Sequence, residues 1–456
     1  MSENVVVENK MGTMPEGRLI LNVSLPVIAS MLVQACYNIV DSVFVAKIGE
    51  NALTAVSLAF TIQLIAIALG AGTGTGMGTL ISQSLGEKNP KKVKAVAANG
   101  ALLFFLSYIA IMLVGVFAVK PFYMTQLKGN DVEIFEMGVS YLSIVCICSF
   151  GIFLQVYFER CLLSSGKSVY AMITQMSGTV VNLVLDPILI FGLLGAPKLG
   201  VTGAAIATVA GQFTGGVMAM IFNQKFNHEV HVSLKGFKPS GELIKAIYKV
   251  GVPSIAMQMV GSIMNFGMNM LFMGISSTMA AVFGGFYRVE SLFIMPIIGL
   301  NGGMTPIMSY NYGAGNKKRI INTLKWGHLW GFVLMFTAFV VMTFFPKALL
   351  SLFSPSEEML RIGIPAFRLI GIHYIFASYG IVSGALFQSV KKAHYTLIDS
   401  AARQVLLLLP LSYILNWIFG PEAIWYSFII SEIGAMVIAF IYVQIIKKTV
   451  FVQMPD

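Results

Sequence analysis

Long apolar runs separated by short polar segments dominate the chain. A helix needs about 20 apolar residues to cross the hydrocarbon core of a bilayer, and the chain contains twelve runs of sufficient length. In chain order they cover residues 19–46, 52–84, 93–119, 135–158, 168–192, 200–222, 243–275, 279–309, 321–346, 359–387, 393–417 and 422–446. This pattern predicts an all-α integral membrane protein with twelve transmembrane helices.

Composition indicates the same class. Hydrophobic residues make up 57% of the 456 residues and charged residues only 11%, which excludes a soluble globular domain and a disordered chain. The four cysteines lie in apolar stretches without a paired metal-ligand spacing, so we expect neither a zinc site nor a disulfide framework. Residues 1–17 are polar and mixed in charge, and we therefore expect the first apolar run to be a membrane span and not a cleaved signal peptide.

Basic residues are distributed unevenly between the two sides of the predicted membrane. Most lysines and arginines lie at the N-terminus, in the even-numbered loops and in the C-terminal tail. The positive-inside rule then places both termini in the cytoplasm of a multi-pass protein of the plasma (inner) membrane. The net charge of +10 is thus first a topology signal. Anionic lipid is a second partner of clusters such as NKKR (316–319), and no nucleic-acid partner is expected.

The two halves of the chain repeat each other. Residues 26–96 match residues 253–323 at a constant shift of 227. The aligned pairs are Pro26 and Pro253, Asn38 and Asn265, Gly72 and Gly299, Gly76 and Gly303, Ser82 and Ser309, and Gly86 and Gly313. Because each half holds an even number of spans, both halves keep the same orientation in the membrane. The sequence therefore predicts two six-helix lobes that arose from a parallel internal duplication.

The predicted domain division follows this repeat. Residues 1–222 form an N-terminal lobe with helices 1 to 6 after a short cytoplasmic tail, residues 223–242 form a cytoplasmic linker, and residues 243–456 form a C-terminal lobe with helices 7 to 12. Parallel repeats with a substrate path between them are a plan of secondary transporters, in which the two halves rock about a central cavity. The organisation of the chain thus favours a transport function.

Two carboxylates interrupt the spans of the N-terminal half. A carboxylate near the bilayer centre costs about 2.5–3.5 kcal/mol, so an intramembrane acid is a functional candidate that faces the protein interior. At 1.5 Å per residue, Asp41 lies about 7 Å and Asp186 about 9 Å from the outer face of the membrane. Tyr141 and Thr208 come at about 9 and 12 Å, and Asn182 lies one helical turn before Asp186 on the same face. Five polar groups are therefore predicted in one layer.

These groups have the chemistry of a monovalent cation site. Carboxylate and amide oxygens are hard ligands that suit Na⁺, together with the Leu183 carbonyl, which Pro187 leaves without its helical partner. The candidate Na⁺ ligands are Asp41, Asn182, Asp186 and Thr208. In a poorly hydrated site Asp186 can carry a proton instead, since burial favours the neutral carboxyl. The alternative is structural: Asp186 braces a kink at Pro187, and Asp41 braces helix 1 against helix 5.

Charged residues of both signs occur in the spans of the C-terminal half. The candidates are Arg288, Glu290, Arg368, His373, Asp399, Arg403 and Glu432. Glu290, Arg403 and Glu432 lie about 15 Å from a membrane face, which fits either buried ion pairs that tie helices together or a second coupling or substrate site. Asp399 and Arg403 are spaced at i, i+4 and are placed to pair within their helix. His373 stands alone, and we expect a satisfied core histidine.

With the repeat and the NxxxDP motif in place, the chain resembles the multidrug and toxic compound extrusion (MATE) transporters over essentially its whole length. The matching segments are PVIASMLVQACYNIVDSVFVAKIG (26–49), a glycine-rich helix ending in SQSLGEKNPKK (82–92), NLVLDPILIFG (182–192), GVTGAAIAT (200–208) and FQSVKKAHYTLIDSAARQVLLLLP (387–410). The resemblance implies a secondary antiporter, and not an enzyme, that exports amphipathic, often cationic compounds in exchange for H⁺ or Na⁺. It implies no cofactor, and we expect the protein to act as a monomer.

The resemblance also implies where the cation binds. In the prokaryotic branch whose helix 5 reads NxxxDP, the site lies in the N-terminal lobe. The branch's site residues on helices 1, 4, 5 and 6 match, in chain order, Asp41, Tyr141, Asn182, Asp186 and Thr208. Another branch has an acid early in helix 7, but that stretch reads MQMVGSIMNFGMN (257–269), and Met268 aligns with Asp41. Coupling is therefore expected in the N-terminal lobe only.

Two other functions compete with drug export. A flippase for a lipid-linked saccharide on the same fold would line its cavity with several basic side chains against a pyrophosphate, and only Arg288, Arg368 and Arg403 are candidates for that role. A membrane enzyme acting on lipid would need acids, histidines or a metal motif clustered at one membrane face, and the loops carry no such constellation. Ion-coupled export is the preferred hypothesis.

Overall fold

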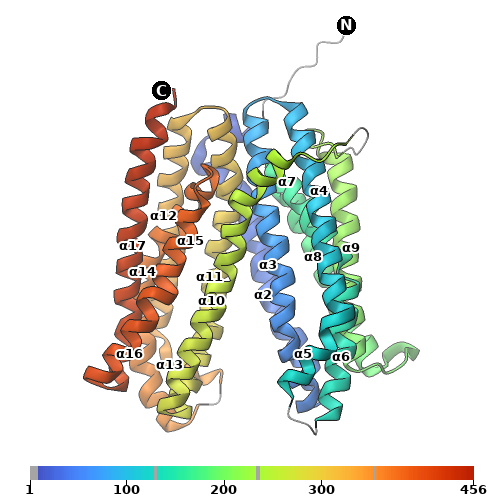
Figure 1. Cartoon of the computed structure of the whole chain (residues 1–456). Coiled ribbons are helices and arrows are strands. Elements are labelled where there is room, and N and C mark those ends of the chain that lie inside the picture. Colours follow the sequence, from blue (N-terminus) through green and yellow to red (C-terminus); the bar gives the residue numbers. More distant parts are fainter. Residues whose placement is uncertain (1–8, 128–130, 233–236, 354, 456) are drawn as a thin grey trace. The chain divides into compact units, whose positions relative to one another are not determined.

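The computed structural model describes residues 9–127, 131–232, 237–353 and 355–455, and this part of the chain is helical without a strand (Figure 1). Its α-helices are α1 (Lys10–Thr13), α2 (Glu16–Ala46), α3 (Glu50–Gly86), α4 (Pro90–Leu113), α5 (Val119–Gln126), α6 (Val132–Ile147), α7 (Phe150–Ser164), α8 (Ser168–Phe191), α9 (Val201–Phe226), α10 (Gly241–Ile275), α11 (Ser277–Gly313), α12 (Lys317–Phe344), α13 (Pro346–Ser351), α14 (Glu357–Ser389), α15 (Ala393–Ala401), α16 (Leu408–Phe419) and α17 (Ile424–Thr449). Two π-helical segments, η1 (Val114–Ala118) and η3 (Ala402–Leu407), and three short 3-10 turns, η2 (Leu193–Gly195), η4 (Pro421–Ala423) and η5 (Phe451–Gln453), complete the list. The predicted all-α class is confirmed.

The helices have the lengths that membrane spans require. Within the described residues, eleven helices are long and apolar enough to cross a bilayer, and the pair α6 and α7 makes a twelfth if it is one bent span. The two members of that pair meet at 43°. The predicted fourth span, 135–158, is therefore not one straight helix, and it continues to Ser164. Ser149 and Gly151 flank the bend, and serine and glycine are residue types at which helices kink.

The helices pack into two compact units. One unit contains the described residues up to Ile28 and from Val252 onward, and the other contains the described residues of Ala29–Gly251. We call them the C-unit and the N-unit. Both boundaries fall inside a helix, in α2 and in α10. The division predicted above follows the order of the chain, whereas the compact units follow packing. Residues 1–8 of the predicted tail and 233–236 of the predicted linker lie outside the described residues.

Glycines explain why the first part of α10 packs within the N-unit. A Cβ atom added at Gly76 of α3 would lie 2.2 Å from the backbone oxygen of Ile247 of α10. One turn later in α10 and one turn earlier in α3, a Cβ added at Gly251 would lie 3.1 Å from the backbone oxygen of Gly72. Only residues without a side chain permit two helix backbones to approach so closely. Gly76 of α3 and Gly251 of α10 therefore permit the close packing of these two helices.

The C-unit uses the repeat-related glycines in the same way. The first part of α2 packs against Gly299 and Gly303 of α11. A Cβ atom added at Gly303 would lie 2.2 Å from Oγ of Ser24. The Ser24 hydroxyl donates a hydrogen bond of 3.2 Å to the backbone oxygen of Leu300. The first helix of each repeat thus begins in the unit of the other repeat. Helix α2 begins in the C-unit, and helix α10 begins in the N-unit.

The remaining packing differs between the units. In the N-unit, α9 packs along α8 and α7, with backbone approaching backbone where Gly178 meets Gly211. In the C-unit, α14 packs against α11, α12 and α17. Large apolar side chains such as Phe117 and Trp417 remain exposed in the structure, as expected for surfaces that face lipid. Since apolar side chains cover the surfaces that face lipid, the polar groups described next lie in the interiors of the units.

Candidate functional site

The predicted polar layer lies in the N-unit. Asp41 is in the second part of α2, Tyr141 is in α6, Asn182 and Asp186 are in α8, and Thr208 is in α9. The structure brings these five side chains into one group through direct contacts and close electrostatic neighbours. Because α8 and α9 cross at glycines, their polar side chains are held close together.

The two carboxyl groups form the centre of the layer. Asp186 is completely buried, with an exposed fraction of 0%, and the Asp41 carboxyl is its nearest charged neighbour, within hydrogen-bonding reach. No described residue donates a hydrogen bond to either oxygen of Asp186 or to Oδ1 of Asp41. Two ionised carboxylates offer only acceptors and repel each other. A proton on one of them, or a cation between them, satisfies both.

Neutral oxygens surround this pair. The Asn182 amide Nδ2 donates to Oγ1 of Thr208 at 3.4 Å, and the Asn182 amide oxygen is buried without a donor among the described residues. Carboxylate, amide and hydroxyl oxygens together are the ligand types that a hard cation prefers. The arrangement therefore has the chemistry to take up a proton or a small monovalent cation.

A tyrosine closes the layer on the side of α6. The Tyr141 hydroxyl accepts a 3.2 Å hydrogen bond from Nε2 of Gln63 on α3, and its side chain is buried. Asp41 and Asp186 are its charged neighbours, and Thr208 is within reach of the hydroxyl. With Gln63 as its donor, the Tyr141 hydroxyl keeps its own proton free to donate towards the acidic pair.

Two members of the layer were not predicted. Tyr37 lies one helical turn before Asp41 on α2, and Asp41, Asp186 and Thr208 are its polar neighbours. Gln63 fixes Tyr141 from α3. The signal for Tyr37 was its i−4 spacing from Asp41, and the signal for Gln63 was its position as a polar residue inside an otherwise apolar run.

The expected kink at Pro187 does not end the helix. Helix α8 continues from Asp186 through Pro187 to Phe191 and ends at Gly192, whose φ of 75° is the left-handed conformation common after a helix. Asp186 is therefore held inside a continuous helix and not at a helix end. Its carboxylate has no capping contact among the described residues, which weakens the structural alternative for this residue.

A half-buried acid, Glu159, was missed because the predicted fourth span ended one residue before it. Glu159 lies in α7, and its Oε1 accepts hydrogen bonds from Nε2 of Gln155 at 2.9 Å and from Oγ1 of Thr174 on α8 at 3.2 Å. Its acceptor Oε1 is thus satisfied twice by the protein. This separates Glu159 from Asp186, whose oxygens find no protein donor.

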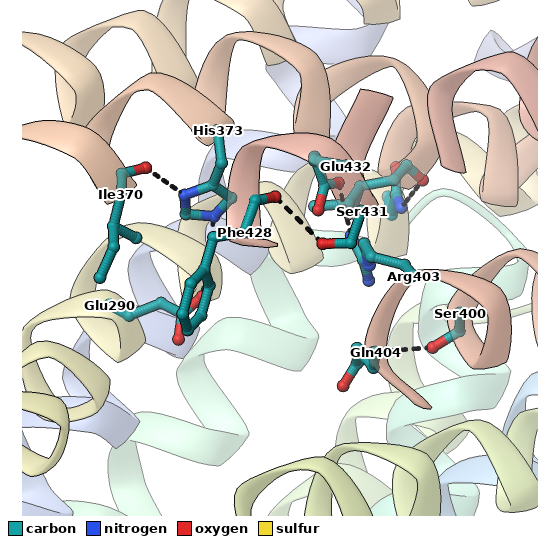
Figure 2. Close-up of polar contacts among 11 residues, drawn as sticks. Glu290, Ile370, His373, Ser400, Arg403, Gln404, Phe428, Ser431 and Glu432 are labelled. Carbon is teal, nitrogen blue, oxygen red and sulfur yellow. Dashed lines mark hydrogen bonds and ion pairs between the residues drawn. The ribbon is translucent and has the colours of Figure 1, made fainter. Parts of the chain in front are cut away.

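The charged residues of the C-unit form a second group (Figure 2). Nη1 of Arg403 lies 3.3 Å from Oε1 of Glu432, so this pair joins η3 to α17. Nε2 of His373 on α14 lies 4.0 Å from Oε1 of Glu290 on α11. The structure thus brings Arg403 to Glu432 and Glu290 to His373, a neighbour that was not expected for His373. The histidine is buried and its Nδ1 lies 2.5 Å from the Ile370 backbone oxygen, as expected for a satisfied core histidine.

Two expectations for this group are wrong. Asp399 and Arg403 make no ion pair, because the π-helical segment η3 begins between them and changes the i, i+4 spacing that an α-helix would give. Among the described residues, Oδ1 of Asp399 is buried without a partner. Arg288 is exposed on α11 and makes no ion pair with a described residue, so the structure does not bring it to the group.

A metal cofactor site is not apparent. Within the described ranges, no three histidine, cysteine, aspartate or glutamate side chains gather in a way that could hold a metal ion. All four cysteines are free. The acidic pair with its neutral oxygens therefore stands out as the arrangement most suited to a small cation.

Comparison with known protein families places these observations in context. The family model described as MatE matches residues 26–188 and 253–414, which are the two repeats. The matched ranges include Asp41, Tyr141, Asn182 and Asp186 in the first repeat. They end before Thr208.

Individual relatives cover almost the whole chain. A protein of Staphylococcus saprophyticus named "Multidrug export protein MepA" is 24% identical over 441 residues, 95% of this chain and 94% of the relative. A protein of Shewanella oneidensis named "FAD transporter" is 24% identical over 419 residues, 90% of each chain. A solved structure, described as an outward-facing conformation of a multidrug resistance MATE family transporter of the MOP superfamily, is 26% identical with a TM-score of 0.89 and covers 95% of this chain and 97% of its own. The similarity is therefore to transport proteins over their full length.

Proposed function

Because the chain belongs to the MatE family, we propose that it is a secondary antiporter that exports amphipathic, often cationic compounds in exchange for H⁺ or Na⁺. Members of the family are membrane transporters and not enzymes, they need no cofactor, and their cargo is small molecules. Exchange for an ion and the class of cargo are the proposed parts. Function by a monomer, a plasma (inner) membrane location and cytoplasmic termini belong to the same proposal.

The observation that carries the exchange is the contact between Asp41 and Asp186. A buried Asp186 carboxyl without a protein donor, beside the half-buried Asp41 carboxyl, is stable only with a proton or a cation between the two groups. Loading and release of that ion changes the charge of the layer by one. In a transporter that rocks between two states, such a change favours one state over the other.

Each residue of the layer has a distinct role in this proposal. Asp41 and Asp186 carry the charge that the ion neutralises. Asn182 and Thr208 supply neutral oxygens and are joined by a hydrogen bond. Tyr141, whose hydroxyl accepts from Gln63, keeps a hydroxyl proton to donate when the ion is released. The side chains that hold the ion come from the three helices α2, α8 and α9, so its binding draws those helices together.

Cationic cargo is favoured over a pyrophosphate-linked cargo by the placement of the arginines. The Arg403 guanidinium is paired with Glu432, and Arg288 and Arg368 are exposed. A pyrophosphate needs unpaired basic groups that converge on one cavity. The relative named as an FAD transporter makes FAD the first anionic compound to assay, and a lipid-linked saccharide the second.

The test is export of a fluorescent cationic dye from proteoliposomes under an imposed pH gradient and, separately, a Na⁺ gradient. Asp186→Asn removes the charge with little change in volume, and the matched control Asp131→Asn changes an exposed acid outside the spans. We expect one gradient to drive export by the wild type and by Asp131→Asn, and no export by Asp186→Asn. Normal export by Asp186→Asn would place the ion elsewhere. Failure of folded wild type to move any dye under both gradients would refute cationic cargo and transfer the assay to FAD and lipid-linked saccharides.

A further inference from the structure

The chain just before α2 is held on the C-unit by directional contacts. Nη2 of Arg319, at the start of α12, donates to the backbone oxygens of Met14 at 2.6 Å and of Met11 at 3.3 Å. The Met11 oxygen also accepts from Nδ2 of Asn311 on α11 at 3.0 Å. Nη1 of Arg319 lies 3.7 Å from Oε1 of Glu16, the first residue of α2. We call these contacts of Arg319 the Arg319 clasp.

The clasp is partly buried and is not a loose surface contact. The Met11 side chain is completely buried, with an exposed fraction of 0%, and the Arg319 and Glu16 side chains are 15% and 19% exposed. Met11 lies in the four-residue helix α1, and Met14 follows that helix. The last carbonyls of a helix have no partner within the helix. A guanidinium, with its planar fork of donors, satisfies two such carbonyls in one fixed geometry.

Helix α2 links the clasp to the proposed ion site. It runs without interruption over Glu16–Ala46, but its residues up to Ile28 belong to the C-unit and those from Ala29 onward, with Asp41, belong to the N-unit. Pro26 lies next to this division and removes one helical hydrogen bond. The helix is therefore weakest where it passes from one unit to the other, and it is fixed at its first turn by the clasp.

The contacts along the first part of α2 do not all resist the same movement. Apolar packing is non-directional, so a helix can slide or turn along its seat at modest cost. The hydrogen bonds of Arg319 are directional and specify both the height and the rotation of the helix start. Loss of the clasp leaves the packing of Ser24 against Gly303 and the Ser24 hydrogen bond to Leu300 but removes the directional contacts at the start of the helix.

We propose that Arg319 is a positioning residue for transport, which keeps the first part of α2 in register on α11 and α12 so that changes at Asp41 move the units and are not absorbed by sliding of the helix. The inference rests on the proposed function, because it takes Asp41 as part of the ion site. It assigns a role to Arg319, which is not part of the acidic layer.

The other repeat supplies a matched control. Lys92 is the repeat partner of Arg319 at the shift of 227, but its ammonium pairs with Glu87 at 2.8 Å, where both side chains are 33% exposed. Among the described residues the Lys92 side chain pairs with Glu87 and not with α10. The chain just before α10 is joined to α4 instead by the Ser240 amide, which donates to Oδ1 of Asn99 at 2.9 Å. Arg319→Gln and Lys92→Gln therefore remove the same charge from related positions, one with a clasp and one without.

The experiment measures three quantities on full-length protein: dye export in proteoliposomes, the apparent melting temperature, and the pH dependence of carbodiimide labelling at Asp41 and Asp186 by mass spectrometry. For Arg319→Gln we expect export to fall by at least about tenfold, the factor that corresponds to one charge-assisted hydrogen bond, while the labelling profile matches wild type. Lys92→Gln should export at the wild-type rate. Arg319→Lys keeps the charge without the fork and should lie between.

Three results would overturn the inference: wild-type export by Arg319→Gln or Arg319→Lys, an equal loss of export in Lys92→Gln, or a labelling profile that changes in parallel with export. If Arg319→Gln does not fold, the dye export of Arg319→Lys tests the inference instead. If the wild type itself exports nothing, the proposed function fails and not the clasp. The two failures are thus distinguishable.

A rescue separates anchoring from any electrostatic effect of Arg319. A Cβ added at Gly12 would lie 3.0 Å from the Tyr310 ring, so a short bismaleimide can join Gly12→Cys to Tyr310→Cys after the exposed Cys36 and Cys148 are replaced by alanine. In an Arg319→Gln background we expect this cross-link to restore export. Complete cross-linking without recovery would mean that anchoring of α2 is not what Arg319 provides.

Discussion

The close packing of α10 on α3 leads to a quantitative prediction for Gly76→Ala. The added methyl carbon would lie 2.2 Å from the backbone oxygen of Ile247, and real Cβ contacts do not fall below 3.0 Å. No side chain can rotate away, because the opposing atom is backbone. Helix α10 must therefore move off α3 by most of an ångström, or α3 must bend.

The size of the effect follows from comparison with Gly70→Ala on the same helix. A Cβ at Gly70 would lie 3.7 Å from the Phe153 ring, which is ordinary contact. Both substitutions bring the same gain in helix propensity, roughly 0.5–1 kcal/mol, so this gain cancels between them. Overpacking at Gly76 costs about 1–3 kcal/mol. At about 2–4 °C per kcal/mol for a unit of this size, Gly76→Ala should melt about 2–12 °C below Gly70→Ala.

Thermal unfolding of both variants in detergent, followed by intrinsic fluorescence, measures this difference. Dye export by the same preparations shows whether the displaced helix also impairs transport, which we expect for Gly76→Ala alone. Equal melting temperatures would mean that the first part of α10 does not rest on α3. In that case the assignment of this segment to the N-unit would be wrong, and with it the explanation of the repeated glycines.

Three further substitutions probe the buried polar groups. Glu432→Gln should lower the apparent melting temperature, because it leaves the Arg403 guanidinium without its acid at a cost of roughly 1–3 kcal/mol; an unchanged melting curve would show that the pair is not formed. Glu290→Gln should leave the fold nearly as stable, and its dye export then decides between a structural acid and a second functional site. Tyr141→Phe keeps the ring packing but loses the hydroxyl that Gln63 holds, so export should fall with little change in melting temperature. Unchanged export would remove Tyr141 from the ion site.

Much of the fold was predictable because membrane spans are encoded by composition over long windows. The limits of most spans agree with the helices within a few residues, and the depth argument grouped Asp41, Asp186 and Asn182 in advance. The bend between α6 and α7 was not predictable, because Ser149 and Gly151 favour a kink but also occur in straight apolar helices. The missed Glu159 follows directly from that bend, which extends the helical segment beyond the predicted span.

The arrangement around Arg403 could not be predicted for a different reason. An i, i+4 spacing implies contact only while the helix is α-helical, and η3 is π-helical from Ala402. The residue types of that segment do not predict the change from α-helical to π-helical hydrogen bonding. The partner of Arg403 is consequently Glu432 on another helix, a contact that depends on tertiary packing.

The packing of α2 and α10 explains which features the two repeats still share. Gly76 and its repeat partner Gly303 both lie where the first helix of the other repeat packs closely, and a side chain at either position would push that helix away. No such constraint acts on the partner of Asp41. Met268 occupies that position with an exposed fraction of 0%, and its apolar side chain contributes packing where Asp41 contributes charge. The glycines were thus retained by a symmetrical steric requirement, whereas the polar layer is present in one repeat only, which is where we propose that the ion binds.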